Sequence, residues 1–523
     1  MCIRDSYIDL PSSDISSNYY YNFSALNFER YGGTAWETNA TNNLVLKSPG
    51  TSPTGHNLTD MADTPNLTYA ATNGGLNAII RPEAINYSTN RAKMLTAAVA
   101  YIQNDYNTGY MYGDIKGAFL SDTDTTNVSA DTLNSVNTFD GTFASSTGWT
   151  TDSDWTISGG VATCNGNNSG RFIYPTNDRW TSGSSVVVEV TVTAYTSGTL
   201  QVSYATGAAT SGTDMTATGT YKFVNNVSGN ELIYLRSESF IGSIDNVKIY
   251  YAESDRSVNN KGLIPYGTIT KSAVATGADL VAYSGFSASN YLQQPYNSSL
   301  DFGTGDLSIM FWFKTPSGSV PTECFLHRGD GGTGTWGSGK IIQIEFNSTN
   351  LAAFLAESAF SSFDTVAITG TQAATGQWMH YTLIRRGTFV GVYLNGELKA
   401  STSSSRNLSN TSAKTWIGER PNSSRPATTS SLALFRISAT APSPEQVKKM
   451  YNDEKHLFVE NAKATLYGSS DAVTALAYDE DTELLHVGTS AGRSDFQGLR
   501  RINNTTTAVT TAISASDDLI AEQ

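Results

Sequence analysis

At 523 residues the chain is too long for one hydrophobic core, and we expect roughly three or four domains. Charged residues make up only 15% of the chain. The formal net charge of −14 argues against a partner with a phosphate backbone, which lysine and arginine clusters would bind. The many Thr, Tyr and Val residues are typical of exposed antiparallel sheet. We therefore predict an all-β, multi-domain protein that does not bind nucleic acid.

Cys2, Cys164 and Cys324 are the only cysteines, and their odd number and wide spacing fit neither a disulfide framework nor a zinc site. The sequence holds no apolar run of membrane-spanning length and no signal peptide. The opening Met1–Ser6 resembles a spurious leader from an assembled environmental read, and Ile520–Gln523 contains no closing strand. We therefore expect both ends to be incomplete.

The first part of the chain is expected to pass from irregular structure into strands. Residues 1–60 are rich in Tyr, Asn and Ser with weak alternation, so we predict a loop-rich segment. Residues 61–133 contain Met94–Gln103 and Asp105–Leu120, whose pattern predicts strand, polar turn, strand, glycine turn and strand.

Residues 134–254 are predicted to form a separate module. Val188, Val190 and Val192 alternate with polar residues, as in an antiparallel strand with one face in solvent. The opening FDGTFASSTGWTTDSDWTISGGVA and the closing GSIDNVKIY resemble the galactose-binding-like jelly roll of carbohydrate-binding modules. In that family the acidic residue of the closing motif often ligates a structural calcium ion. The resemblance therefore implies a Ca²⁺ site on Asp245, with Asp140 as a partner.

Aromatic and basic residues of this module are candidate glycan ligands, because aromatic faces pack against sugar C–H groups and polar side chains fix the hydroxyls. A tryptophan in a jelly roll can equally belong to the core. The polar composition of the loop PTNDRWTSG favours exposure of its tryptophan. The candidates are Trp149, Trp155, Arg171, Arg179 and Trp180.

Residues 255–457 are predicted to form a β-sandwich. Leu307–Phe313 is apolar on both faces, which indicates a strand buried on both sides. Asn395-Gly396 between apolar runs is a strong hairpin signal. The segments SLDFGTGDLSIMFWFK, GQWMHYTLIRRGTFVGVYLNGELKAS and TWIGERP resemble the laminin-G-like (concanavalin-A-like) jelly roll, whose members mostly bind glycans or proteins.

A helix is expected at the end of this sandwich. Ser443 is a suitable N-cap, Pro444 fits the first helical position, and Gln446 completes a capping box. We expect the helix to lie as a lid at the edge of the sandwich.

The loops of the sandwich supply further candidates for ligand binding, namely Asp330 and Trp336 in a glycine-rich loop and Arg420 in GERPNSSRP. A mobile hairpin tip is the alternative for the glycine-rich loop. Ala433 replaces the acidic residue that the family usually carries near its end, which weakens the case for calcium there.

We expect no enzymatic activity. The E-x-D-x-x-E strand of the laminarinase relatives, which brings carboxylates together for acid–base work, is absent from the sequence. Glu345 stands alone and is expected at an edge or a turn. The five histidines show no metal-binding spacing.

Residues 458–523 repeat the plan of residues 61–133, with strands expected at Ala472–Tyr478, Glu483–Thr489 and Gly498–Ile502. This unit resembles a β-propeller blade. Because one blade cannot bury its faces, the resemblance implies further blades from missing sequence or from other subunits. Two unrelated β-meanders are the alternative.

Two glycan-module-like sandwiches between propeller-like segments resemble, in their order, bacteriophage tail proteins from marine viruses. The resemblance implies a non-enzymatic tail-fibre or receptor-binding protein of the virion, oligomeric or held by tail-assembly partners. Its ligand would be a host surface glycan or glycoprotein, and no membrane insertion is implied. The alternatives are an accessory carbohydrate-binding part of a secreted bacterial glycan-degrading enzyme or adhesin, and an intracellular scaffold that binds protein.

Overall fold

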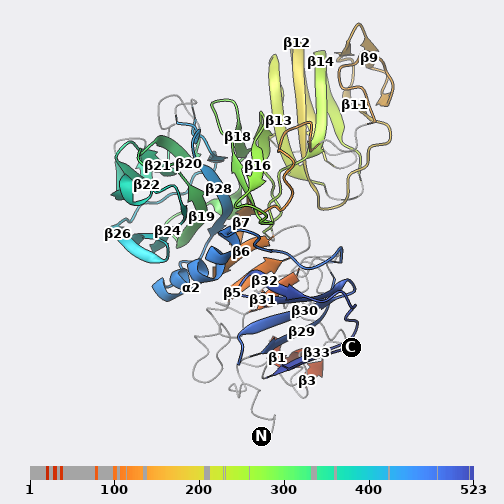
Figure 1. Ribbon diagram of the computed structural model, residues 1–523. Coiled ribbons are helices and arrows are strands. Elements are labelled where there is room, and N and C mark those ends of the chain that lie inside the picture. The colour runs from red at the N-terminus through yellow and green to blue at the C-terminus, as the bar shows by residue number, and fades with distance from the viewer. Residues whose placement is uncertain are drawn as a thin grey trace.

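In a computed structural model the chain folds almost entirely into β-strands, and the predicted all-β class is confirmed (Figure 1). The structure describes residues 115–133, 138–204, 212–227, 229, 231–257, 259–330, 339–358, 362–421, 425–470, 472–479, 481–516 and 519–523, and the backbone alone of six earlier strands. Those six strands are β1 (Tyr19–Asn22), β2 (Asn27–Tyr31), β3 (Trp36–Thr38), β4 (Asn77–Ile80), β5 (Ala98–Ile102) and β6 (Asn107–Tyr112).

These early strands form two small sheets, β1-β2-β3 and β4-β5-β6. Residues 1–60, predicted to be loop-rich, therefore include a three-stranded sheet, and the rest of that range lies outside the described residues.

The first sandwich, residues 138–251, is built on two very long strands, β12 and β14. Bulges interrupt their pairing, and β14 pairs with β11 along its first part and with β10 further on. The predicted alternation is confirmed, since Val188, Val190 and Val192 point into the core. The strands are β8 (Trp149–Thr151), β9 (Trp155–Ser158), β10 (Val161–Asn165), β11 (Ser169–Pro175), β12 (Ser185–Ser203), β13 (Gly219–Asn226) and β14 (Tyr234–Tyr251).

The second sandwich has two larger sheets. The seven-stranded sheet has the order β15 (Ile264–Tyr266), β18 (Tyr291–Gln294), β27 (Lys414–Ile417), β20 (Thr322–Gly329), β21 (Ile341–Asn347), β22 (Asn350–Ser358) and β23 (Ser362–Thr369). The eight-stranded sheet has the order β16 (Thr270–Ala273), β17 (Val281–Ser284), β28 (Ser431–Ser438), β19 (Leu307–Lys314), β24 (Trp378–Arg386), β25 (Phe389–Leu394) and β26 (Glu397–Ser403), and β7 (Ile115–Phe119) pairs with β28.

The strand β19 is buried on both faces, as predicted. Ile309 and Phe311 face the core between the two sheets. Met310 and Trp312 face a second core on the outer side of the eight-stranded sheet. The hairpin at Asn395-Gly396 is also confirmed, with both residues at the positive φ angles that this tight turn requires.

The position of β7 corrects the predicted domain boundary. The pattern placed Ile115–Phe119 in the propeller-like segment of residues 61–133. Instead, Phe119 pairs with Phe435 and Gly117 with Ile437, so the strand belongs to the second sandwich. The reason is that β17 touches β28 only at Leu432, which leaves the rest of that strand's edge to be paired.

The helix α2 (Pro444–Glu454) has the predicted capping box between Ser443 and Gln446. It lies over the outer face of the eight-stranded sheet and not only at an edge, because Val447 and Met450 pack into the core that Trp312 enters. A short 3₁₀ helix, η5 (Lys455–Phe458), continues it. Within the described residues, no helix is long and apolar enough to cross a membrane.

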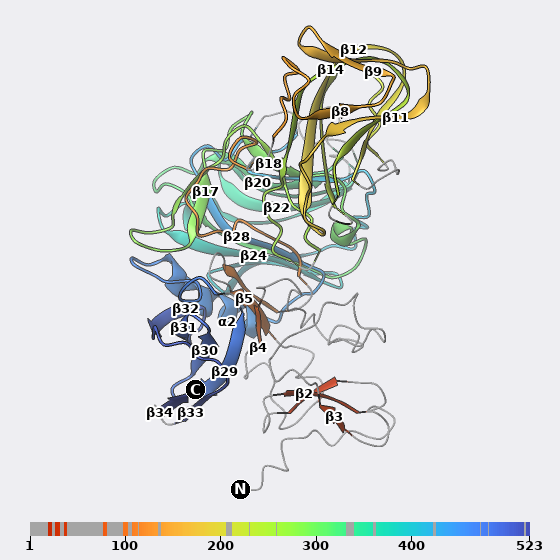
Figure 2. The same cartoon turned by 90° about the vertical axis from the view of Figure 1, so that its right-hand side faces the viewer.

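The C-terminal strands form a four-stranded meander in chain order. The three predicted strands are present, and Gly492–Gln497 adds a fourth that the sequence did not predict. Val487 and Phe496 of this sheet pack against the second sandwich, and Figures 1 and 2 show it on the side opposite to the first sandwich. The β4-β5-β6 sheet is separate from it, and the propeller resemblance stays a prediction. The strands are β29 (Val473–Asp479), β30 (Leu484–Thr489), β31 (Gly492–Gln497) and β32 (Arg500–Asn504), followed by the hairpin of β33 (Ile513–Ser516) and β34 (Leu519–Glu522). The expectation of no closing strand at Ile520–Gln523 is therefore wrong, because these residues pair with β33.

Candidate functional site

Aromatic side chains gather on the outer side of the first sandwich, where β11, β14 and β12 lie side by side. The ring of Tyr174 on β11 lies against the ring of Tyr234 on β14, with their centroids 4.8 Å apart. Phe172, two residues earlier on β11, lies 5.5 Å from Tyr234 in an edge-to-face arrangement. All three rings are half-buried, so each presents part of its surface to solvent.

The alternation of β11 explains why these rings point outward. Ile173, between Phe172 and Tyr174, is fully buried in the core of the first sandwich. Since neighbouring residues of a strand point to opposite faces, the two aromatic residues must lie on the other side.

Hydrogen-bonding groups border the rings. Arg236 lies opposite Gln201 in the strand register, and its guanidinium donates to the Gln201 side chain over 3.3 Å. The same guanidinium forms an ion pair with Glu238. The Gln201 amide donates in turn to Asp214 over 2.7 Å. These contacts hold the polar groups in fixed positions next to the aromatic rings.

We call Phe172, Tyr174, Gln201, Tyr234 and Arg236 the aromatic face. Ring faces can pack against the C–H surface of a flat ligand, while amide and guanidinium groups bind its hydroxyl groups. Because the polar groups are already held by neighbouring side chains, little conformational entropy is lost when a ligand binds. The aromatic face therefore has the chemistry of a binding surface for sugars.

The three tryptophans proposed from the sequence lie elsewhere. Trp149, Trp155 and Trp180 are 8%, 4% and 1% exposed and belong to the core of the first sandwich. The Trp149 indole N–H donates to the Asp140 carbonyl oxygen over 2.8 Å, and Trp180 packs edge-on against Tyr251. The structure thus contradicts their prediction as exposed platforms, because no ring face is open to a ligand.

The loop around Trp180 shows why its polar composition was misleading. Asp178, two residues earlier, is buried and accepts hydrogen bonds from the backbone N–H and the hydroxyl of Thr138. A satisfied buried carboxylate allows the loop to turn inward and place the indole in the core. Of the two arginines proposed with it, Arg179 is exposed in this loop and Arg171 is half-buried on β11.

The predicted calcium ligands come from neighbouring segments. Asp245 lies in β14, next to a bulge in its pairing with β12. Val247 N–H donates to the Gly141 carbonyl oxygen over 2.9 Å, which brings the turn that follows Asp140 next to this part of β14. The Asp140 carboxylate accepts bonds from Thr142 and Ser145, and these bonds lower its pKa. The part of the chain that the structure describes contains no group of three or more potential ligands, and the calcium site stays a prediction.

The loop candidates of the second sandwich have different positions. Asp330 is half-buried directly after β20, and Trp336 lies outside the described residues. Arg420 is buried, and its guanidinium donates to Glu345 over 3.2 Å. A binding role for Arg420 is therefore contradicted, because its charge is already neutralised inside the protein.

The position of Glu345 also differs from the prediction. It lies in the middle of β21, and not at an edge or a turn, and it forms ion pairs with Arg420 and Arg425. The side-chain N–H of Gln343 donates to the same carboxylate, and the Gln343 Oε1 accepts a 2.7 Å bond from His327 Nδ1–H. Burial raises the pKa of Glu345, while the two arginines oppose that shift. This is a closed, buried network.

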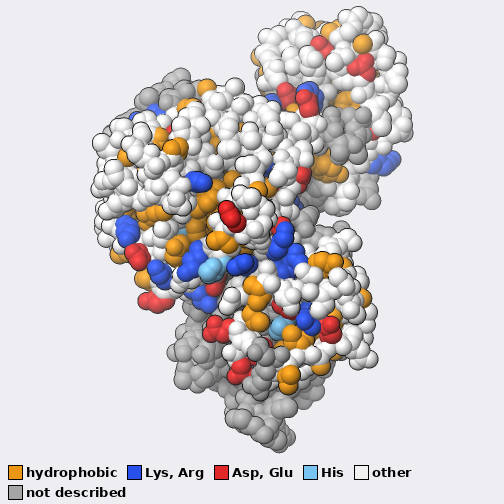
Figure 3. All heavy atoms as spheres, in the orientation of Figure 1, with side chains coloured by type: hydrophobic (Ala, Val, Ile, Leu, Met, Phe, Trp, Pro, Cys, Tyr) orange, Lys and Arg blue, Asp and Glu red, His pale blue; other side chains and the backbone are white. Residues whose placement is uncertain are grey.

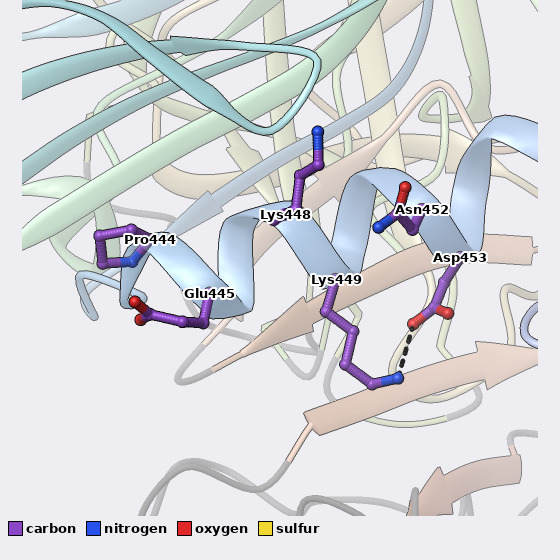
Figure 4. Close-up of a pocket in the computed structure, with 6 residues that line it drawn as sticks. All are labelled: Pro444, Glu445, Lys448, Lys449, Asn452 and Asp453. Carbon is purple, nitrogen blue, oxygen red and sulfur yellow. Dashed lines mark ion pairs between the residues drawn. The ribbon is translucent and has the colours of Figure 1, made fainter.

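An open hollow of about 500 Å³ runs along α2, lined by Pro444, Glu445, Lys448, Lys449, Asn452 and Asp453 (Figure 4). The Lys449 ammonium lies 3.8 Å from the Asp453 carboxylate, and the two side chains point toward each other. The hollow has charged walls and no aromatic side chain, so it lacks a stacking surface for a sugar.

Comparison with known proteins supports the fold of the second sandwich. Residues 286–448 match the sequence profile described as the concanavalin A-like lectin/glucanases superfamily. This segment therefore has the lectin/glucanase fold that its motifs predicted. No curated protein matches the chain.

Solved structures show a more distant likeness. The receptor-binding domain of botulinum neurotoxin mosaic serotype C/D is 17% identical over 38% of this chain and 48% of its own, with a TM-score of 0.30. The binding domain of Paraclostridial Mosquitocidal Protein 1 is 16% identical over 46% of this chain and 62% of its own, with a TM-score of 0.32.

Domain 4 of AbnA, an extracellular arabinanase from Geobacillus stearothermophilus solved with arabinotriose, is 20% identical over 37% of this chain and 84% of its own, with a TM-score of 0.27. The chain thus spans less than two thirds of either toxin domain. These similarities leave the function open.

Proposed function

We propose that the protein binds glycans on a surface, without chemical turnover, through the aromatic face of the first sandwich. The observation that carries this proposal is the half-exposed trio of Phe172, Tyr174 and Tyr234 beside the fixed polar pair of Gln201 and Arg236. A sugar needs both kinds of contact, since its C–H face is apolar and its edge carries hydroxyl groups.

The absence of turnover is part of this proposal. Hydrolysis of a glycosidic bond generally uses two carboxyl groups on either side of the bond. Glu345, the acidic residue on the central strand β21, is buried and paired with Arg420 and Arg425, so it is not available as an acid or a nucleophile. A binding function requires neither group.

The biological setting that we favour is the tail of a virus, where the protein would be a fibre or receptor-binding component with host glycans or glycoproteins as ligands. The order of the modules along the chain motivates this choice. Neighbouring genes for portal, capsid or tail proteins would support it. A secretion signal on the complete gene would instead favour an accessory part of a secreted glycan-degrading protein or adhesin.

The aromatic face is tested by screening the purified chain on a glycan array and measuring the affinity of the best ligand by calorimetry. We expect Tyr174→Ala and Tyr234→Ala each to weaken binding by about tenfold, equivalent to about 1.4 kcal/mol.

Tyr221→Ala is the matched control, because Tyr221 is also half-buried in the first sandwich but lies on β13, which pairs with a different part of β12. It should leave affinity unchanged. If both substitutions leave the affinity unchanged, the aromatic face is not the glycan-binding site, and the loops near Asp330 become the next candidate. A chain that binds no glycan at all would refute the proposed function.

A further inference from the structure

Three basic side chains lie close together where the end of α2 touches the C-terminal sheet. Lys455 and His456 begin η5, and Arg500 begins β32. Arg501, the next residue of the strand, points to the opposite face, where it lies over the Tyr467 ring and within electrostatic range of Asp279. We call Lys455, His456 and Arg500 the basic cluster. Leu457 of η5 and Leu499 of the β31–β32 turn lie in the same hydrophobic core, which holds the two segments together.

The members of the basic cluster influence one another. Partial burial lowers the pKa of His456, and Lys455 and Arg500 lower it further, so the three groups lie within electrostatic range. The His456 side chain is the most exposed of the three, and Lys455 and Arg500 are half-buried. The cluster therefore reaches solvent, and Figure 3 shows lysine and arginine side chains gathered beside a histidine between the second sandwich and the C-terminal sheet.

No carboxylate forms an ion pair with these three groups among the described residues. Lys455 contacts the Asn452 amide and the Tyr451 ring. The Nε–H of Arg500 is buried without a hydrogen-bond partner in the described structure.

Elsewhere in this acidic chain, basic residues are commonly paired with carboxylates. The neighbour Lys463, for example, binds Asp279 over 2.8 Å. Arg406 and Arg493 are paired in the same way. Arg385 and Arg386 also lack an ion pair among the described residues, but their guanidinium groups donate to backbone carbonyl oxygens. The basic cluster differs because several basic groups without an ion pair lie together.

A structural role explains only part of the cluster. Cations in the last turn of a helix favour its negative end, and Lys455 and His456 occupy such positions. Arg500 comes from a distant strand and has no such role. Its guanidinium presents several N–H donors in a plane, which matches the oxygens of a sulfate or carboxylate group.

We propose that the basic cluster is a second binding site, which holds the sulfate or carboxylate groups of an acidic polysaccharide. A polysaccharide with spaced anionic groups fits a compact set of three basic residues. A nucleic acid, whose phosphate backbone is continuous, would need a longer basic surface. This site is independent of the aromatic face and does not rest on the function proposed for it.

The test uses the full chain and three polymers of similar length: dextran sulfate, alginate and neutral dextran. We expect dextran sulfate or alginate to bind, more weakly as salt increases, and dextran not to bind at this site. Arg500→Ala should reduce the affinity at least tenfold and His456→Gln several-fold. Arg500→Lys should fall between wild type and Arg500→Ala, because it keeps the charge but loses the planar donors.

Lys248→Ala is the matched control, since it removes one positive charge from the first sandwich, where Lys248 pairs with Asp131. It should change the affinity less than twofold. Melting temperatures of all variants establish that they fold, and the exposed His456 provides the test if Arg500→Ala does not. Equal loss in Lys248→Ala and Arg500→Ala, no binding of either acidic polymer, or tighter binding of a single-stranded DNA oligonucleotide would overturn the proposal.

Discussion

Replacing Glu454 is expected to loosen the attachment of α2 to the second sandwich. Its carboxylate is completely buried and forms a double ion pair with Arg436, one arm of which measures 2.8 Å. It also accepts a 2.6 Å hydrogen bond from the Trp312 indole N–H. Glu454→Gln leaves the Arg436 guanidinium buried without a counter-charge, which costs about 3–5 kcal/mol.

Hydrogen exchange at the amides of α2 measures this loss, because it reports the free energy of local opening in a multi-domain chain. A loss of about 3–5 kcal/mol corresponds to exchange faster by roughly two to four orders of magnitude. Glu397→Gln is the control, since Glu397 also pairs with lysines but on the surface, where such a pair contributes about 1 kcal/mol or less.

A double variant, Arg436→Met with Glu454→Met, separates the unpaired charge from the lost packing. It removes both charges. The Trp312 N–H then lacks its acceptor, which costs about 1–3 kcal/mol, and the Leu434 carbonyl oxygen loses the Arg436 Nε–H as a donor. The double variant should therefore be more stable than Glu454→Gln. This reasoning would be refuted if Glu454→Gln accelerated exchange no more than Glu397→Gln does. It would also be refuted if the double variant were less stable than Glu454→Gln.

Two further predictions concern a carboxyl group and a bulge. Burial raises the pKa of Asp255 to about 6 despite bonds from three backbone N–H groups. Because its folded pKa exceeds the unfolded one, stability present below about pH 4 should decline by about 3 kcal/mol toward pH 6 and then level off. Exchange at the Ala118 amide, corrected for its intrinsic pH dependence, should show this decline in wild type and lack it in Asp255→Asn. Gly198→Ala should destabilise the first sandwich far more than Gly183→Ala. Both glycines have positive φ, but a Cβ at Gly198 would lie 1.9 Å from the Ser239 carbonyl oxygen, whereas the space at Gly183 is open. Equal melting temperatures for the two variants would contradict the steric explanation.

Local patterns predicted much of the fold. The double-sided apolar run of β19, the alternating valines of β12 and the capping box of α2 are each set by residues close in sequence, and the structure contains all three. The lectin-like fold of the second sandwich followed from the order of such segments.

What the sequence did not predict depends on partners far along the chain. The strand β7 has the pattern of a local meander, and only the open edge of β28 decides that it joins the second sandwich. Arg420 lies in a loop of polar composition, which favours exposure. Its guanidinium is buried instead, because it forms an ion pair with Glu345 on β21, far earlier in the sequence.

The aromatic face was missed for a related reason. The run Arg171–Pro175 alternates aromatic and apolar side chains, and this alternation was the available signal. The sequence prediction chose tryptophans as sugar-binding residues because they have the largest rings. Their size favours burial in a small core, as Trp180 shows, whereas the smaller rings of Phe172 and Tyr174 remain half-buried.

The first sandwich is inserted into the second between β7 and β15, and this arrangement has a mechanical consequence. The chain leaves the larger body after β7 and returns to it at β15, so two covalent tethers anchor the smaller one. Backbone hydrogen bonds hold both connecting segments against the second sandwich. Arg256 N–H donates to the Ala118 carbonyl oxygen, and Val128 pairs with Ile269. A force applied through a ligand on the smaller body would be divided between the two tethers. Two connecting segments restrict the rotation of the first sandwich more than a single linker would. A pull on the first sandwich would therefore be transmitted directly to the second.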